Sequence, residues 1–157
     1  MHTWVVLESP ELGVKRYEIH KFFNKKTGNY LYVNAQAPNE GMSIFIIPKK
    51  FYSKSKFKSR CIFKLTGLQA KNVIENIENN ISKYPYLNKY SLYPGPNSNT
   101  FTRWVLDLNI ATKDLNLPFN AFGRFFNRSL DIESLSSQFT LLIHIASTLY
   151  APSAYIL

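Results

Sequence analysis

A single stretch carries the chain from loop into helix: Tyr93-Pro94-Gly95-Pro96-Asn97-Ser98-Asn99-Thr100-Phe101. Two prolines and a glycine prevent regular structure up to Pro96, and apolar residues then recur at helical spacing as far as Leu108. A helix should therefore begin near Ser98. The first backbone N–H groups of a helix lack partners, and the helix dipole favours negative charge there. This position suits either a capping side chain, from Ser98 or Asn99, or a nucleophile beside a developing oxyanion.

This helix start is one of three sequence blocks. His2-Thr3-Trp4 opens the first predicted strand, and Leu117-Pro118-Phe119-Asn120-Ala121-Phe122-Gly123 follows the nine-residue stretch. In this order the blocks resemble those of a mostly bacterial family of uncharacterised proteins, domain of unknown function 3750. The resemblance extends from residue 2 to residue 123 and implies a bacterial protein. It implies no particular activity.

A second resemblance suggests chemistry. In permuted papain-like hydrolases, such as lecithin:retinol acyltransferase and relatives of the NlpC-type peptidases, a histidine opens an early strand and an Asn-Cys-x-x-Phe motif starts a later helix. His2 is similar to the first element, and Asn97-Ser98-Asn99-Thr100-Phe101 is similar to the second. This implies a permuted papain-like fold with Ser98 in place of the thiol. Because a hydroxyl is a poorer nucleophile than a thiolate, either a neighbouring base activates it or the site has lost catalysis and kept binding.

The first two predicted strands form a hairpin. Residues 3–7 and 14–23 have strand patterns, and turn-forming residues separate them at 9–13. If the hairpin is centred on residue 11, opposite residue numbers sum to 22, and His2 lies opposite His20. His2 would then be the general base beside Ser98, and His20 or Glu18 would orient its ring.

Further segments complete the predicted fold. Strand patterns recur at 30–33, 42–47 and 60–65, and helical patterns occur at 68–82 and 139–150. Thr66-Gly67-Leu68-Gln69 has the spacing of a capping box for the helix at 68–82. We therefore expect an α+β fold in which an N-terminal antiparallel sheet packs against about three helices. At 157 residues, the chain should form a single domain over 1–157.

Composition limits the class of protein. Apolar residues make up 45% of the chain, which suits a globular core, and the one cysteine, Cys61, excludes an internal disulfide and should be a buried small hydrophobe. Because nucleotide-loop and metal-ligand motifs are missing, we expect no cofactor and no metal. The uncharged segment 139–157 contains polar residues and a proline, which favours a buried helix over a membrane span. No secretory signal pattern is visible, so the cytoplasm is the default location.

The chain is a basic protein, with a net charge of +9 from 19 Lys and Arg against 10 Asp and Glu. Seven basic residues and no acidic one lie between Lys49 and Lys64. Four of them alternate at period two, which on a strand places them on one face: Lys54, Lys56, Lys58 and Arg60. This face is a candidate for binding an anionic partner; the alternative is a solvated strand face. Nucleic acid is the least supported partner, because only charge and aromatic residues point to it.

Two functions fit these patterns. The first is hydrolysis or acyl transfer on an amide or ester of a small-molecule, peptide or lipid-like substrate, with Ser98 as nucleophile, His2 as base and His20 as orienting residue. Backbone N–H groups near Asn99 and Thr100 would bind the oxyanion. The residues expected to contact the substrate are Asn97, Asn99, Thr100, Trp4 and Tyr93. The second function is a non-catalytic binding module that recognises an anionic ligand or a peptide at Asn97-Ser98-Asn99.

Overall fold

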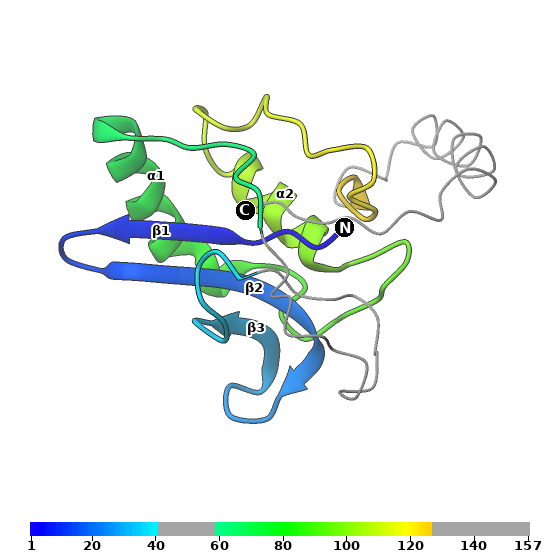
Figure 1. The fold of residues 1–157 in the computed structure, drawn as a ribbon. Coiled ribbons are helices and arrows are strands. Elements are labelled where there is room, and N and C mark those ends of the chain that lie inside the picture. Colours follow the sequence, from blue (N-terminus) through cyan, green and yellow to red (C-terminus); the bar gives the residue numbers. More distant parts are fainter. Residues whose placement is uncertain (41–58, 127–157) are drawn as a thin grey trace.

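The computed structural model of the chain describes residues 1–40 and 59–126 (Figure 1). The elements follow the order β1 (Val5–Ser9), β2 (Gly13–Asn24), β3 (Asn29–Val33), α1 (Gly67–Asn80), the 3-10 helix η2 (Ile81–Lys83) and α2 (Ser98–Asp107). The three strands form one antiparallel sheet in the order β1-β2-β3. The prediction of an α+β fold with an N-terminal antiparallel sheet is therefore confirmed.

The hairpin of β1 and β2 has the predicted register. Val5 pairs with Tyr17 and Ser9 pairs with Gly13, so opposite residue numbers sum to 22. Odd-numbered residues of both strands consequently share one face of the sheet, and even-numbered residues share the other. The predicted strands at 14–23 and 30–33 correspond to β2 and β3, which are joined by a turn between Asn24 and Asn29.

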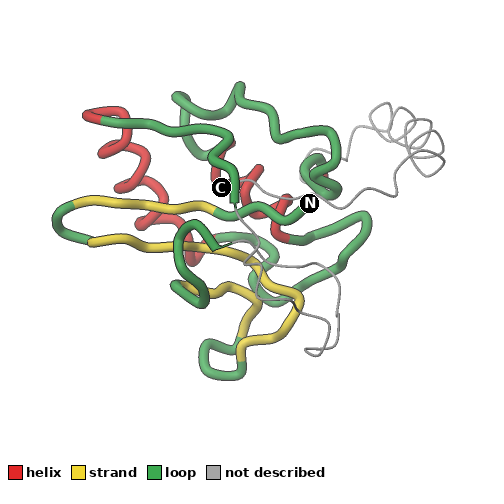
Figure 2. Tube along the Cα trace, in the orientation of Figure 1, coloured by secondary structure: helices red, strands yellow, loops and turns green. Residues whose placement is uncertain are grey.

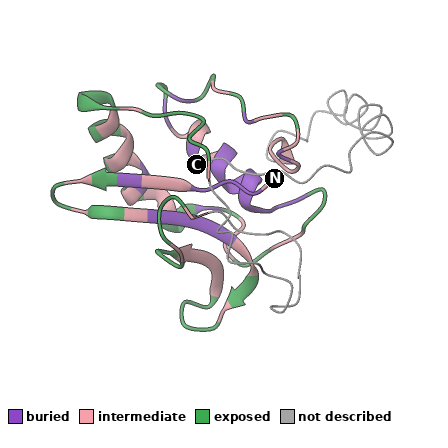
Figure 3. Ribbon diagram, viewed as in Figure 1, coloured by how far each residue is buried: buried purple, intermediate pink, exposed green. Residues whose placement is uncertain are grey.

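The odd-numbered face of the sheet packs against the helices, which Figure 1 shows behind the strands. One buried cluster joins the sheet to both helices and consists of Leu7, Tyr17, Ile19, Ile77, Tyr84, Phe101 and Val105. The ring of Tyr84 meets the rings of Phe101 and Trp104 edge-on at 5.2 Å between centroids. Figure 3 shows that burial is concentrated in α2 and in the middle of β2. The helix that begins at Ser98 is thus enclosed by the core along most of its length.

A long loop after α2 returns to the start of that helix (Figure 2). Arg103 of α2 is 1% exposed and holds the first part of this loop. Its guanidinium pairs with Asp107 and donates to the carbonyl oxygens of Lys113 and Leu115. Because these bonds anchor the loop to the side of α2, the following residues, 117–126, lie beside the N-terminal end of the helix.

Three local predictions are wrong. The segment 59–66 contains no regular secondary structure, so the predicted strand at 60–65 does not form; residues 60–64 are exposed and pair with none of the described strands. Cys61 is exposed rather than buried. The predicted helix at 68–82 is confirmed by α1 and η2, but Thr66, its N-cap, makes no side-chain capping hydrogen bond, and the capping box is not formed.

Other predictions fall on residues outside the described ranges. They concern the strand at 42–47, the third helix at 139–150 and the uncharged segment 139–157. Within residues 1–40 and 59–126, no helix has the length and apolar character needed to cross a bilayer. The permuted papain-like arrangement and the single domain over 1–157 stay predictions.

Candidate functional site

The start of α2 is fixed by a capping box. Asn97 is the N-cap, and its side-chain oxygen accepts hydrogen bonds from the backbone N–H groups of Asn99 at 2.9 Å and Thr100 at 3.3 Å. The Thr100 hydroxyl accepts in return from the backbone N–H of Asn97 at 3.1 Å. The helix therefore begins at Ser98 as predicted, but the expectation that Ser98 or Asn99 is the cap is wrong. The Ser98 hydroxyl consequently has no capping role.

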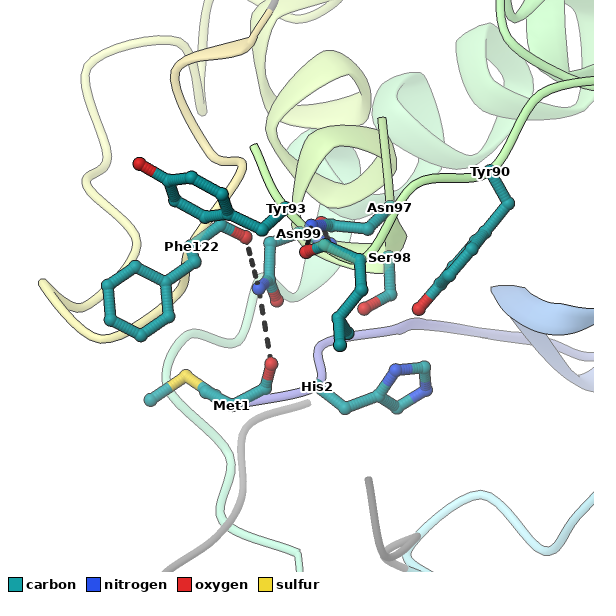
Figure 4. Close-up of a pocket in the computed structure, with 9 residues that line it drawn as sticks. Met1, His2, Tyr90, Tyr93, Asn97, Ser98, Asn99 and Phe122 are labelled. Atoms are coloured by element: carbon teal, nitrogen blue, oxygen red, sulfur yellow. Dashed lines mark hydrogen bonds between the residues drawn. The ribbon is translucent and has the colours of Figure 1, made fainter. Parts of the chain in front are cut away.

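The three sequence blocks meet at this helix start. Thr3 donates from its hydroxyl to the side-chain oxygens of Asn99 at 3.0 Å and Thr102 at 2.8 Å. The amide nitrogen of Asn99 donates to the carbonyl oxygens of Phe122 at 2.7 Å and of Met1 at 3.2 Å, as the dashed lines in Figure 4 show. The first strand and the loop after α2 are thereby held against the same turn of helix.

The Asn97 and Thr100 side chains make further internal bonds. Asn97 donates from Nδ2 to the carbonyl oxygen of Leu92 at 3.0 Å, and the Thr100 hydroxyl donates to the carbonyl oxygen of Gly123 at 2.7 Å. Asn97, Asn99 and Thr100 are all less than 4% exposed. Their contact with a substrate stays a prediction; in this structure their polar groups bond to the chain itself and position Ser98.

The same capping box changes which backbone groups are available to an oxyanion. The N–H groups of Asn99 and Thr100, which the sequence suggests as donors, point at the side-chain oxygen of Asn97. In the described part of the chain, the backbone N–H of Ser98 has no hydrogen-bond partner. The first N–H of α2 is therefore the one that an anion beside Ser98 can reach.

His2 belongs to a buried ionic network on the even-numbered face of the sheet. Its Nε2 lies 2.9 Å from Oε2 of Glu18, and the same oxygen accepts a hydrogen bond from Arg16 at 2.8 Å. Arg16 also donates to the carbonyl oxygens of Ala37 and Glu40, and its guanidinium lies 4.0 Å from the ring centre of Trp4. His2 is 8% exposed, and Arg16 and Glu18 are fully buried. The loop before residue 41 thus covers the charged network.

Glu18 is held in its ionised form. Burial by itself raises the pKa of this carboxyl, but the hydrogen bond to His2 and the charges of His2 and Arg16 together bring the pKa below its ordinary value. An ionised carboxylate only accepts hydrogen bonds, so Nε2 of His2, which faces Glu18, carries a proton, and in the neutral form of the ring this is its one proton. The other ring nitrogen, Nδ1, is then an acceptor.

His20 and Trp4 lie close to this network in different ways. His20 is half-buried, and its ring meets the rings of Phe22 and Tyr32 at 5.2 and 5.1 Å between centroids. Burial lowers the pKa of His20, against a smaller raising effect of the Glu18 charge. The side chain bonded to His2 is Glu18, which the sequence names as the alternative to His20. Trp4 is 1% exposed and donates to the carbonyl oxygen of Pro38.

A pocket of about 240 Å³ lies between the start of α2 and the first residues of the chain (Figure 4). The residues that line it are Met1, His2, Tyr90, Leu92, Tyr93, Asn97, Ser98, Asn99 and Phe122. Ser98 and His2, which the sequence pairs, thus border one cavity. In the view of Figure 4 the hydroxyl ends of the Ser98 and Tyr90 side chains both lie above the His2 ring. Trp4 does not line this pocket.

The predicted anion-binding face lies largely outside the description. Lys54, Lys56 and Lys58 fall in the range 41–58, and Arg60 is exposed in a segment without regular structure. Among the described residues, no group of three or more His, Cys, Asp or Glu side chains has an arrangement that could hold a metal ion. An anionic partner at this segment stays a prediction.

Sequence reasoning missed part of the site. Arg16 and the loop at 34–40 that surrounds it were not expected there, although Arg16 and Glu18 at i and i+2 of one strand signal an ion pair on one face. Tyr90 and Phe122 each line the pocket, and the sequence does not single them out as site residues. No local pattern distinguishes them from core aromatic residues.

Comparison with known proteins places the chain in a family without supplying an activity. No curated protein and no solved structure matches the chain significantly. Residues 1–126 match the model of the family described as protein of unknown function (DUF3750), so the chain belongs to that family.

Proposed function

We propose that the chain is a serine-dependent hydrolase or acyltransferase that acts on an amide or ester, with Ser98 as nucleophile and His2 as general base. One observation carries the proposal. A serine at the first position of a helix and a histidine backed by a buried carboxylate border the same small pocket. A nucleophile, a base beside it and a group that orients the base are the parts that acyl transfer requires.

The hydrogen bonds of His2 assign its two nitrogens. Nε2–H donates to Glu18, so Nδ1 is the atom that would take the proton from the Ser98 hydroxyl as its oxygen attacks a carbonyl carbon. Nδ1–H would then return the proton to the leaving amine or alcohol as the acyl bond to that group breaks. Water, or a second alcohol or amine, would release the acyl group from Ser98 by the same path in reverse. Among the described residues, no hydrogen bond joins Ser98 to His2 before a substrate binds; in many hydrolases this bond closes only in the substrate complex.

Two donors suit the negative oxygen formed in this step. One is the backbone N–H of Ser98 itself, at the positive end of α2. The other is the Tyr90 hydroxyl, which lines the pocket and has no hydrogen-bond partner within the described residues. Burial raises the pKa of the Tyr90 phenol, so the hydroxyl keeps its proton at neutral pH and can donate a hydrogen bond to the oxyanion.

Replacement of Ser98 by alanine tests the proposal. We expect Ser98→Ala to abolish both turnover of activated esters and covalent labelling by a fluorophosphonate probe. Because the cap is Asn97 and not Ser98, this variant should lose no capping interaction and should fold like the wild type. The matched control is Ser82→Ala, which changes an exposed serine of η2 that does not line the pocket. Labelling of Ser98→Ala at the wild-type rate would exclude Ser98 as the nucleophile.

A second function has an observation in its favour. The side chains around Ser98 bond to the chain itself, and the Ser98 hydroxyl is not held by a base in the described structure. A non-catalytic binding module needs no such bond, and it would use the same pocket. In that case the wild-type chain binds its ligand, the fluorophosphonate probe labels neither protein, and Ser98→Ala binds as well as the wild type.

A further inference from the structure

The wall of the pocket indicates which ligands it accepts. None of the nine lining residues has an Asp, Glu, Lys or Arg side chain, and most of the wall comes from Met1, Tyr90, Leu92, Tyr93 and Phe122. The α-amino group of Met1 already donates to the carbonyl oxygen of Asn120 at 3.5 Å, and burial lowers its pKa, which favours its neutral form. A charged group placed in the pocket would therefore leave water without meeting an oppositely charged side chain, which costs several kcal/mol. An apolar group gains from the same transfer. The pocket therefore selects against charge.

The volume of the pocket limits the size of the group. An apolar cavity of about 150 Å³ holds a benzene molecule, and drug-sized ligands need about 300 Å³ or more. At about 240 Å³, the pocket has room for one benzene-sized group together with a carbonyl and its substituent. An acetyl group would leave much of the space empty, and a long fatty chain would exceed it.

Polar and apolar walls fix the direction of the group. The Ser98 and Tyr90 hydroxyls, which bond to no described residue, both lie above the His2 ring in Figure 4. Tyr93 and Phe122 lie on the other side of the pocket in that view. Leu92 and Tyr93 both line the pocket and are 66% and 52% exposed. Large apolar side chains that stay exposed beside a cavity are typical of binding surfaces. A carbonyl would face Ser98, and its apolar substituent would lie against Tyr93 and Phe122.

We infer that the pocket binds an uncharged, apolar acyl group of about the size of benzoyl or hexanoyl, with its carbonyl at Ser98 and Tyr90. This inference rests on the proposed function, since it names the acyl part of the substrate. It goes further because it excludes charged acyl groups, acetyl groups and long fatty chains as preferred ligands.

Ketones test the inference without any reaction. Acetophenone and heptan-2-one have the required shape and cannot be hydrolysed, whereas acetone is too small and 4-acetylbenzoate is charged. We expect the first two to bind the full chain at least 10-fold more tightly than the last two, measured by NMR titration. Leu92→Asp should weaken acetophenone binding at least 10-fold. Leu68→Asp is the matched control, because Leu68 is 74% exposed on α1 and does not line the pocket.

The outcomes separate the inference from the proposed function. Equal binding of all four ketones, or equal effects of the two leucine variants, would overturn the inference whatever the turnover. The same preference in p-nitrophenyl ester hydrolysis, with benzoate and hexanoate above acetate and decanoate, would support both. Selective ketone binding without Ser98-dependent turnover would keep the inference as a ligand assignment and overturn the proposed function. Ser98-dependent turnover at equal rates for all four esters would support the proposed function and overturn the inference.

Discussion

Replacement of Gly123 by alanine should destabilise the protein strongly, because this glycine touches the cap of α2. A Cβ atom at Gly123 would lie 2.5 Å from Nδ2 and 2.7 Å from Oδ1 of Asn97. The Asn97 side chain cannot turn away cheaply, since Oδ1 accepts two backbone N–H groups and Nδ2 donates to Leu92. Gly123 also has φ of +88°, where residues with a Cβ are strained.

The magnitude follows from these parts. A Cβ in the left-handed region costs about 1–2 kcal/mol, and loss of an N-cap side chain costs about 1 kcal/mol. Loss of the Asn97–Leu92 hydrogen bond adds about 1 kcal/mol. We therefore expect Gly123→Ala to lower the free energy of unfolding by about 3–4 kcal/mol. It should also reduce any activity that depends on Ser98, because the helix start would shift.

The control is Gly28→Ala. Gly28 has φ of +70°, and a Cβ there meets no atom within 4 Å, so this variant measures the backbone strain alone. Urea unfolding should show a loss of about 1–2 kcal/mol for Gly28→Ala. In an Asn97→Ala background, Gly123→Ala should cost only the backbone strain that Gly28→Ala measures, because the clashing side-chain atoms are gone. If Gly123→Ala costs no more than Gly28→Ala, the close contact between Gly123 and the cap is refuted.

Two further predictions concern buried polar groups. Glu18 has its pKa lowered from 4.5 in the folded state, so the stability it contributes is present above pH 4.5 and is lost as the pH falls through the folded value. Glu18→Gln should therefore be less stable than the wild type at pH 7, and this difference should shrink in urea unfolding below pH 4.5; a pH-independent difference would contradict an ionised Glu18 carboxylate between His2 and Arg16. The Tyr84 hydroxyl is buried without a hydrogen-bond partner in the described residues, so Tyr84→Phe should raise the free energy of unfolding by about 1 kcal/mol, and a loss of stability would show that the hydroxyl has a partner.

The parts of the fold that the sequence predicts are those with local causes. The turn around residue 11 and the alternation of the flanking strands determine the register of the hairpin. Apolar spacing gives α1 and α2 in the same way. The failed strand at 60–65 contains the apolar run Cys61-Ile62-Phe63, but a strand needs a neighbouring strand to pair with, and none lies there among the described elements.

The cap of α2 shows a finer limit of sequence reasoning. Asn97, Ser98 and Asn99 are all good N-cap residues, so composition does not choose among them. The choice depends on Thr100, whose hydroxyl accepts from the backbone of Asn97 and closes the box three residues on. Capping boxes usually have Glu or Gln at this place, so a threonine there gives a weak signal.

The candidate site was only half predictable for a different reason. Register places His2, Arg16 and Glu18 on one face of the sheet, but it does not say whether that face is covered. The loop that buries Arg16 lies 21 to 24 residues farther along the chain, at Ala37 and Glu40. Burial is what turns a surface ion pair into a network that holds His2, and burial of this kind arises from contacts that no short pattern contains.

The internal bonds of the helix start also decide which residue of the family signature is left for chemistry. Four polar residues follow one another from Asn97 to Thr100. Asn97 caps the helix, Asn99 ties it to the first strand and the later loop, and Thr100 bonds to Gly123, across separations of 2 to 98 residues. Ser98 alone among the four has a hydroxyl that bonds to no described residue, and that hydroxyl borders the pocket. Because the side chains of the other three residues build this arrangement, the Ser98 hydroxyl, which bonds to no described residue, is the group for which a chemical role has to be sought.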